Sequence, residues 1–187
     1  MFAHYDLTDR ASYRAMLEAH AEVLLRLEAQ LDHCAELVID DWSERKRTAL
    51  LNEDRHDLGM VRLPIQGKAV IGHVTSTGVS TAPLESGRIR QLLNNEEPAR
   101  QKAAIAGTLY VLEGSRLGGR FLARRLPPDF PRRYLDADQP ADKWRKFLEK
   151  FDALLYQQAL LDSAAEAAVE AFAAFERSGR KWLMKAK

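Results

Sequence analysis

The sequence predicts an all-α fold in a single domain, and three observations support this. Its 187 residues match the size of one domain and are enough to enclose a hydrophobic core. Apolar residues recur at steps of three and four along five segments, as they do on one face of a helix. Glycine and proline, which end helices, lie between these segments. We therefore expect one helical domain over residues 1–187.

Two helices are predicted before residue 60. The first begins near Thr8 or Asp9, since either side chain can cap a helix N-terminus. A second runs from about Asp41 to Leu58 and ends at Gly59, which suits a C-terminal cap. The apolar stripe of the first helix consists of Tyr13, Met16, Leu17, His20, Leu24, Leu27 and Leu31.

Residues 60–97 differ from the rest of the chain and are predicted to be a loop-rich insertion. Prolines and glycines interrupt this stretch at Pro64, Gly67, Gly72, Gly78, Pro83 and Gly87. The short apolar pieces between them predict loop, with a short strand pair near residues 70–79 and a short helix around Arg88–Asn94.

Three more helices are predicted after the insertion. A long helix runs from about Pro98 to Leu126, where Pro127 and Pro128 end it because proline cannot continue the hydrogen-bond ladder. The last two run from about Ala141 to Ala159 and from Asp162 to Arg177, after a connector over 129–140. Their apolar faces are predicted to contain Trp144, Phe147, Leu148, Phe151, Leu154 and Leu155, and then Val169, Phe172 and Phe175.

Composition narrows the class of partner. Lys and Arg number 28 against 27 Asp and Glu, and this balance argues against nucleic-acid binding. The single Cys34 excludes an internal disulfide and a cysteine-only metal site, and it suits a reducing cytoplasm. No apolar run reaches the roughly 18–20 residues that span a membrane, and the N-terminus lacks the pattern of a signal peptide. We expect a cytoplasmic protein with no membrane or nucleic-acid partner.

Four glycines interrupt the long helix that begins near Pro98. Each costs roughly 0.5–1 kcal/mol relative to alanine in a helix interior. At about 100° per residue, Gly107, Gly114 and Gly118 share one face, and Gly119 lies beside them. Two interpretations stay open, which are close packing against another helix and a flat ligand lying across the helix.

The same segment carries a resemblance to a known family. The sequence Tyr110-Val-Leu-Glu-Gly-Ser-Arg-Leu-Gly-Gly119 closely resembles the distal-helix motif of bacterial haem oxygenases, particularly the biliverdin-producing enzymes associated with bacteriophytochromes. Residues 47–59, 6–28 and 169–176 are also similar to segments of that family. The resemblance spans most of the chain except residues 60–97.

This resemblance implies a haem-oxygenase-like helical bundle that cleaves haem to biliverdin, carbon monoxide and ferrous iron. Haem would be both cofactor and substrate. Electrons would come from a donor such as a ferredoxin or a reductase, and a bacteriophytochrome would be a functional partner. By the same resemblance, Gly114 and Gly118 lie over haem beside Gly119, and Ser115 stands where many members have a carboxylate that orders water. Lys146 and Lys150 fall where the family places basic partners of the haem propionates.

One family feature has no counterpart in the sequence. The histidine that binds haem iron lies about ten residues before the Asp-Leu pair that matches Asp6-Leu7, a position that precedes Met1. His4 and His20 are the substitute candidates for the metal ligand. For the chain as given we expect weak haem binding. The alternative is therefore a protein of the same fold that does not turn over haem and binds another ligand or a partner.

A remote alternative is a ferritin-like metal protein. Glu53 and His56 have the Glu-x-x-His spacing of carboxylate-bridged di-iron sites, in which residues three apart share a helix face. Such sites need two of these motifs, and the sequence has one clear copy.

Overall fold

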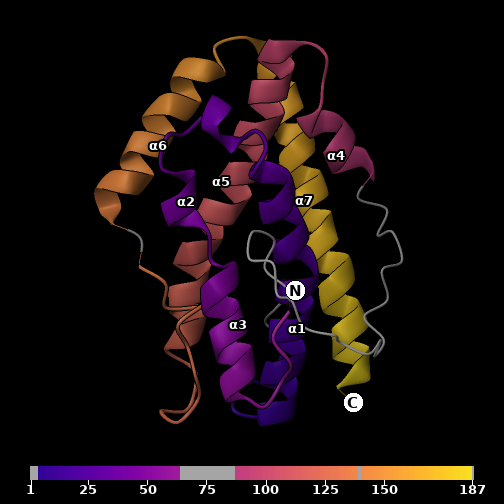
Figure 1. The fold of residues 1–187 in the computed structure, drawn as a ribbon, viewed down its shortest axis with the longest axis vertical. Coiled ribbons are helices and arrows are strands. Elements are labelled where there is room, and N and C mark those ends of the chain that lie inside the picture. Colours follow the sequence, from indigo (N-terminus) through magenta and orange to yellow (C-terminus); the bar gives the residue numbers. More distant parts are fainter. Residues whose placement is uncertain (1–3, 64–86, 139, 187) are drawn as a thin grey trace, which may run out of the picture.

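The computed structural model describes residues 4–63, 87–138 and 140–186, and this part of the chain is all-helical with no strand (Figure 1). The prediction of an all-α fold is confirmed. The elements are α1 (Arg10–Leu31), the short 3-10 helix η2 (Ala35–Leu37), α2 (Trp42–Arg45), α3 (Thr48–Asp57), α4 (Gly87–Leu93), α5 (Pro98–Ala123), α6 (Ala141–Leu154) and α7 (Gln158–Lys185). No helix in the described ranges is long and apolar enough to cross a membrane.

The helices α5 and α7 form the most extensive contact between helices in the described part of the chain. They lie together at one end and separate toward the other, while α1 packs against α7 and α3 (Figure 1). A Cβ added at Gly107 would lie 2.0 Å from the backbone oxygen of Ala164, so only glycine permits this approach. The buried face of α7 accordingly carries small side chains, which are Ala164, Ala167, Ala171 and Ala174.

The first helix begins as predicted. Asp9 is the N-cap of α1, and its carboxylate accepts a hydrogen bond of 2.6 Å from the Ser12 backbone N–H. The apolar stripe of α1 is buried along its whole length. Periodicity therefore identified both the start and the core face of this helix.

The single helix predicted from Asp41 to Leu58 is wrong, because the chain forms α2 and α3 with a break between them. Lys46 has extended backbone angles. The buried carboxylate of Glu28, on α1, accepts hydrogen bonds from the backbone N–H groups of Arg47 (2.7 Å) and Thr48 (3.2 Å). A residue about twenty positions away thus satisfies the first amides of α3, and the local sequence gives no sign of it. The end of α3 is as predicted, since Gly59 has a positive φ of 77°.

The later elements agree with the prediction except at their boundaries and on one face. The short helix near Arg88 is confirmed as α4, whereas the strand pair expected near residues 70–79 lies outside the described residues. Helix α6 ends at Leu154, and α7 extends to Lys185. Val169 and Phe172 were expected in the core, but they are 63% and 57% exposed. Alanines fill the closely packed face instead, which leaves the larger side chains outside.

Gly107 and Gly118 allow a paired stability test within one helix. Gly107→Ala should lower the free energy of unfolding by about 1–3 kcal/mol, because the new Cβ overlaps the backbone of α7. Gly118→Ala should raise it by about 0.5–1 kcal/mol, because a Cβ at that position meets nothing within 4 Å. Urea unfolding of both variants measures the difference, and equal effects at the two sites would contradict the packing described here.

Candidate functional site

The glycines of α5 fall into two groups. Gly107 and Gly119 are packed, and a Cβ at Gly119 would lie 2.8 Å from the Leu135 carbonyl oxygen. Gly114 has only the edge of the Trp144 ring nearby, at 3.9 Å, and Gly118 has open space. Close helix packing therefore accounts for Gly107, whereas Gly114 and Gly118 leave room on the surface of α5, and the flat ligand stays a prediction. Gly119, expected beside a ligand, is buried against the chain instead.

Large apolar side chains are exposed around the two open glycines. The exposed fractions are 40% for Tyr110, 55% for Leu117 and 66% for Phe121. At about 100° per residue, these three residues lie on the same side of α5 as Gly114 and Gly118. This side continues the face that contacts α7 at Gly107, so it becomes exposed where the two helices separate.

Helix α7 carries a second exposed apolar stripe, formed by Leu161, Val169 and Phe172. Leu92 of α4 packs against Ala104 of α5 and Ala167 of α7. On α5, Ala104 and the exposed stripe lie on opposite sides of Gly107. On α7, Ala167 and the exposed stripe lie on opposite sides of Ala164. The two stripes thus belong to one surface, opposite α4. We name it the open apolar face and define it by Tyr110, Gly114, Leu117, Gly118, Phe121, Leu161, Val169 and Phe172.

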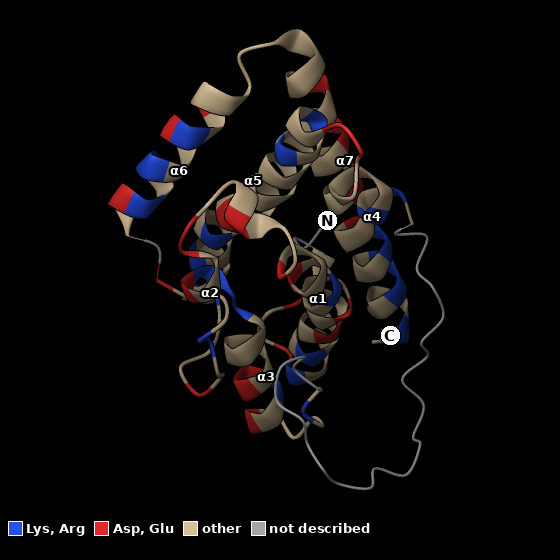
Figure 2. Cartoon of the chain, turned by 45° about the horizontal axis from the view of Figure 1, so that its top comes forward, with Lys and Arg blue, Asp and Glu red and all other residues tan. Residues whose placement is uncertain are grey.

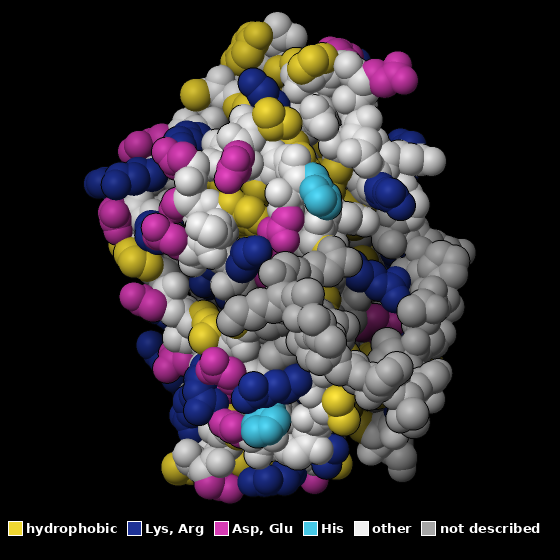
Figure 3. Space-filling model, in the orientation of Figure 1, with side chains coloured by type: hydrophobic (Ala, Val, Ile, Leu, Met, Phe, Trp, Pro, Cys, Tyr) yellow, Lys and Arg dark blue, Asp and Glu magenta, His cyan; other side chains and the backbone are white. Residues whose placement is uncertain are grey.

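Helix α6 borders this face through aromatic contacts. The Tyr110 ring lies 5.7 Å from that of Trp144 and 5.4 Å from that of Phe151, measured between centroids. Groups of exposed large apolar side chains are uncommon on monomers and are typical of binding sites. By contrast, the described residues in Figure 3 mix basic and acidic side chains, with no large patch of one sign.

Ser115 is turned toward the interior of the molecule. Its Oγ donates to the Leu112 carbonyl oxygen (2.6 Å) and accepts from Nη2 of Arg47 (2.7 Å). The same Nη2 also donates to the Leu112 carbonyl oxygen, at 2.9 Å. The structure thus places Ser115 next to a buried arginine, on the side of α5 that faces α3.

Further charged residues are buried on the inner side of α5. Arg45 donates from Nη1 to Glu113 at 2.9 Å, and Arg116 donates from Nε to the same carboxylate at 3.2 Å. Arg116 also donates to the backbone oxygen of Arg45. Sequence reasoning missed these residues and Arg47 as a group, because the contacts that join Arg45 and Arg47 to α5 span 65 or more positions. The sequence signal for this group is the presence of two charged residues, Glu113 and Arg116, in an otherwise apolar helical segment.

His20 belongs to the core and does not lie on the open apolar face. Its Nδ1 is 2.7 Å from the Tyr134 hydroxyl, and its ring packs against that of Phe175. Burial, with a smaller contribution from the charge of Arg47, lowers the pKa of His20 to about 3. The imidazole is therefore neutral, as a metal ligand must be, but it is enclosed in the core and does not reach a flat molecule on the outer side of α5. His4, the other candidate, is an exposed residue of the N-terminal turn.

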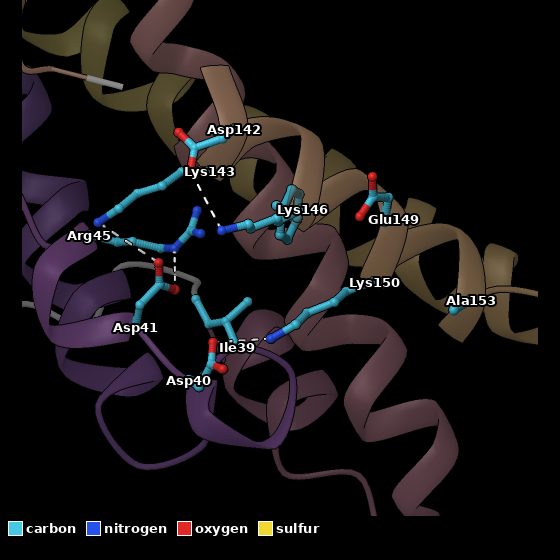
Figure 4. A pocket seen from close by; sticks show the side chains of 11 residues that line it. Ile39, Asp40, Asp41, Arg45, Asp142, Lys143, Lys146, Glu149, Lys150 and Ala153 are labelled. Carbon is cyan, nitrogen blue, oxygen red and sulfur yellow. Dashed lines mark hydrogen bonds and ion pairs between the residues drawn. The ribbon is translucent and has the colours of Figure 1, made fainter. Parts of the chain in front are cut away.

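Lys146 and Lys150 line a separate cavity of about 490 Å³ between α6 and residues 39–45 (Figure 4). Nζ of Lys150 is 3.0 Å from Asp40, and Nζ of Lys146 is 3.6 Å from Asp142. The hydrogen bond from Lys150 holds the pKa of Asp40 below its usual value. Both basic and acidic residues lie along α6 (Figure 2). The open glycines do not line this cavity, so the structure does not bring the lysines and glycines into one pocket.

The Glu53 and His56 pair lies at the surface. Glu53 faces Arg133 at 3.6 Å, and Nδ1 of His56 faces Asp57 at 3.7 Å. Within the described ranges, no three His, Cys, Asp or Glu side chains are placed to hold a metal ion together. The arrangement gives no support to a ferritin-like di-iron site.

Comparison with known proteins finds a relative that covers most of the chain. The chain is 30% identical over 174 residues to a protein named heme oxygenase from Xanthomonas campestris pv. campestris (strain 8004), which covers 89% of this chain and 88% of that protein. No family model matches the chain, and no solved structure matches it significantly.

The environment of His20 predicts a pH-dependent stability. Unfolded chains bind a proton at this histidine below about pH 6.5, whereas the folded chain does so only near pH 3, so stability due to His20 falls as the pH drops between these values. Relative to His20→Gln, the wild-type chain should lose about 2 kcal/mol of unfolding free energy between pH 7 and pH 4.5. Burial raises the pKa of Glu28, an effect of opposite sign that is common to both proteins and cancels in the difference. Urea unfolding at several pH values tests this, and a constant difference between the two proteins would contradict it.

Proposed function

The chain belongs to the haem oxygenase family, and from this we propose that it binds haem on the open apolar face. The observation that carries the proposal is the bare backbone at Gly114 and Gly118, which lies among exposed apolar side chains. A porphyrin is flat and mostly apolar, so it gains most where backbone can approach its ring without intervening side chains. Leu117 and Phe121 on α5, with Val169 and Phe172 on α7, would surround the ring and exclude water from it.

We further propose that the reaction is the oxidative cleavage of haem to biliverdin, carbon monoxide and ferrous iron. Haem supplies the oxygen chemistry when bound, and the protein supplies orientation and a dry environment. The electron donor would be a ferredoxin or a reductase, and the product would serve a bacteriophytochrome. Support comes from the resemblance of residues 110–119 to the distal motif of the biliverdin-producing enzymes and from the name of the related protein.

By the resemblance Ser115 would order water, but it lies on the side of α5 that faces α3, so only water on that inner side could reach it. Its proton is held by the Leu112 carbonyl oxygen, and one lone pair is taken by Arg47. The remaining lone pair can accept a hydrogen bond but brings no negative charge. Water near α5 would therefore donate to Ser115.

Lys146 and Lys150 would need to change partners in order to hold the haem propionates. Their present pairs with Asp142 and Asp40 are solvent-exposed, and exposed ion pairs contribute little to stability. Exchange of these carboxylates for those of haem would therefore cost little. It requires the side chains to reach from the cavity toward the open apolar face, past the aromatic residues of α6.

A second function is favoured by one observation. The open apolar face contains no histidine among its eight residues, and His20 is enclosed behind it. A family member that binds a flat ligand here without turning it over fits this arrangement. The two functions differ in whether an axial ligand is available to the iron.

Hemin titration with and without added imidazole separates these functions. We expect weak binding by the chain alone and tighter binding, at one hemin per chain, when imidazole supplies the axial ligand. Conversion to biliverdin with ascorbate or a ferredoxin system would support the enzyme. Stable hemin binding without conversion would support the alternative, and no binding with imidazole present would overturn both.

A bulky residue at Gly118 should block the proposed site without unfolding the protein. We expect Gly118→Phe to raise the Kd for hemin, measured with imidazole, at least about tenfold, since the side chain would occupy the ring position. The matched control is Gly87→Phe, because Gly87 on α4 also has nothing within 4 Å of its Cβ position and lies away from the open apolar face. Equal affinities of the two variants would contradict this location of the site.

A further inference from the structure

The segment of α5 from Gly114 to Gly119 is a weak stretch of helix. Three of its six residues are glycine, which lowers helix propensity. On its outer side, Gly118 makes no contact that a side chain would provide, and Leu117 is exposed. The position of this segment must therefore be fixed by contacts on its inner side.

Arg47 makes the central inner contact. From the start of α3 its guanidinium donates to the Leu112 carbonyl oxygen and to Ser115 Oγ, one on each side of Gly114 in sequence. Its Cζ lies 5.2 Å from the centre of the Tyr134 ring. Its own backbone N–H donates to Glu28 of α1 at 2.7 Å. One buried residue thus links the glycine segment to α1 and α3.

The partners of Arg47 distinguish it from the other buried arginines. Arg45 and Arg116 share the carboxylate of Glu113, and Arg55 pairs with Glu18. Among the described residues, the guanidinium of Arg47 forms no ion pair with a carboxylate and binds a carbonyl, a hydroxyl and a ring. The groups in direct contact with this guanidinium are neutral, and the Glu28 carboxylate acts on its charge only at longer range, so these contacts serve placement of the helix better than close ion pairing.

We propose that Arg47 is the positioning residue of the glycine segment and fixes where Gly114 and Gly118 present bare backbone. Ser115 completes the arrangement, since its hydroxyl receives one of the two hydrogen bonds from Arg47 and returns its own proton to Leu112. The consequence for ligand binding rests on the proposed function. The mechanical role does not, because it concerns the ligand-free chain.

Amide hydrogen exchange of the ligand-free protein tests the mechanical role. Arg47→Gln should speed exchange in a peptide covering residues 110–119 about tenfold or more, with little change in a peptide covering 160–175. The matched control is Arg55→Gln, which removes an equally buried arginine of α3 that bonds to Glu18 and Asn52 and not to α5. Unchanged exchange at residues 110–119, or the same change in both variants, would overturn the proposal.

Hemin binding with imidazole gives the second readout. Arg47→Gln should raise the Kd about tenfold and shift the Soret band, Ser115→Ala should raise the Kd about threefold, and Arg47→Lys should restore part of the loss. If Arg47→Gln does not fold, Ser115→Ala carries both measurements, and faster exchange at residues 110–119 is again the expected result. If the wild-type chain binds no hemin, the proposed function fails while the exchange experiment still decides the role of Arg47.

Discussion

The contact between the backbones of α5 and α7 determines most of the architecture. Because Gly107 has no side chain, Ala164 can approach it closely, and the two helices meet at one end. From there they separate, so the face of α5 that is packed at Gly107 carries exposed side chains from Tyr110 to Phe121. The open apolar face is therefore a geometric consequence of where the helices touch.

Helix α5 also reverses the usual distribution of polarity at its glycine segment. Its inner side buries Glu113 and Arg116, whereas its outer side exposes Leu117 and Phe121. Helices normally place apolar residues inside and charged residues outside. On the inner side, Glu113 pairs with Arg45 and Arg116, and Arg47 donates to the Leu112 carbonyl oxygen, so these buried polar groups have partners. The apolar side chains of the outer side remain exposed. This reversal is the physical reason to expect an apolar ligand on the outer side.

Much of the fold could be predicted from the sequence, because most helices are defined by local periodicity and caps. Asp9 and Gly59 marked helix ends correctly. The break at Lys46 could not be predicted, since it depends on a carboxylate of another helix. Val169 and Phe172 were misplaced for a related reason, since the periodicity of α7 does not reveal that a neighbouring glycine admits its alanines so closely.

The candidate site shows the same division between local and distant information. Spacing placed Gly107, Gly114 and Gly118 on one face, but the neighbours that cover Gly107 and leave Gly118 open come from elsewhere in the chain. The surroundings of the α6 lysines likewise depend on residues that are distant in the sequence. The aromatic side of α6, which contains Trp144, Phe147 and Phe151, packs toward Tyr110. In this orientation the lysines of α6 line the cavity beside residues 39–45, namely Lys143, Lys146 and Lys150.

The place of α6 therefore governs whether these lysines and the open glycines can serve one ligand. Its apolar contacts with α5 are few, and Phe147 is its only buried residue among those described. Its other contacts with residues 40–44 are ion pairs at or near the surface, Lys143 with Asp41 and Glu44 and Lys150 with Asp40, and such pairs contribute little to stability. A ligand that carries carboxylates can compete with these aspartates and glutamates on nearly equal terms. An anionic flat molecule would then draw the lysine side chains from their present partners at small energetic cost, whereas an uncharged flat molecule would leave these ion pairs in place.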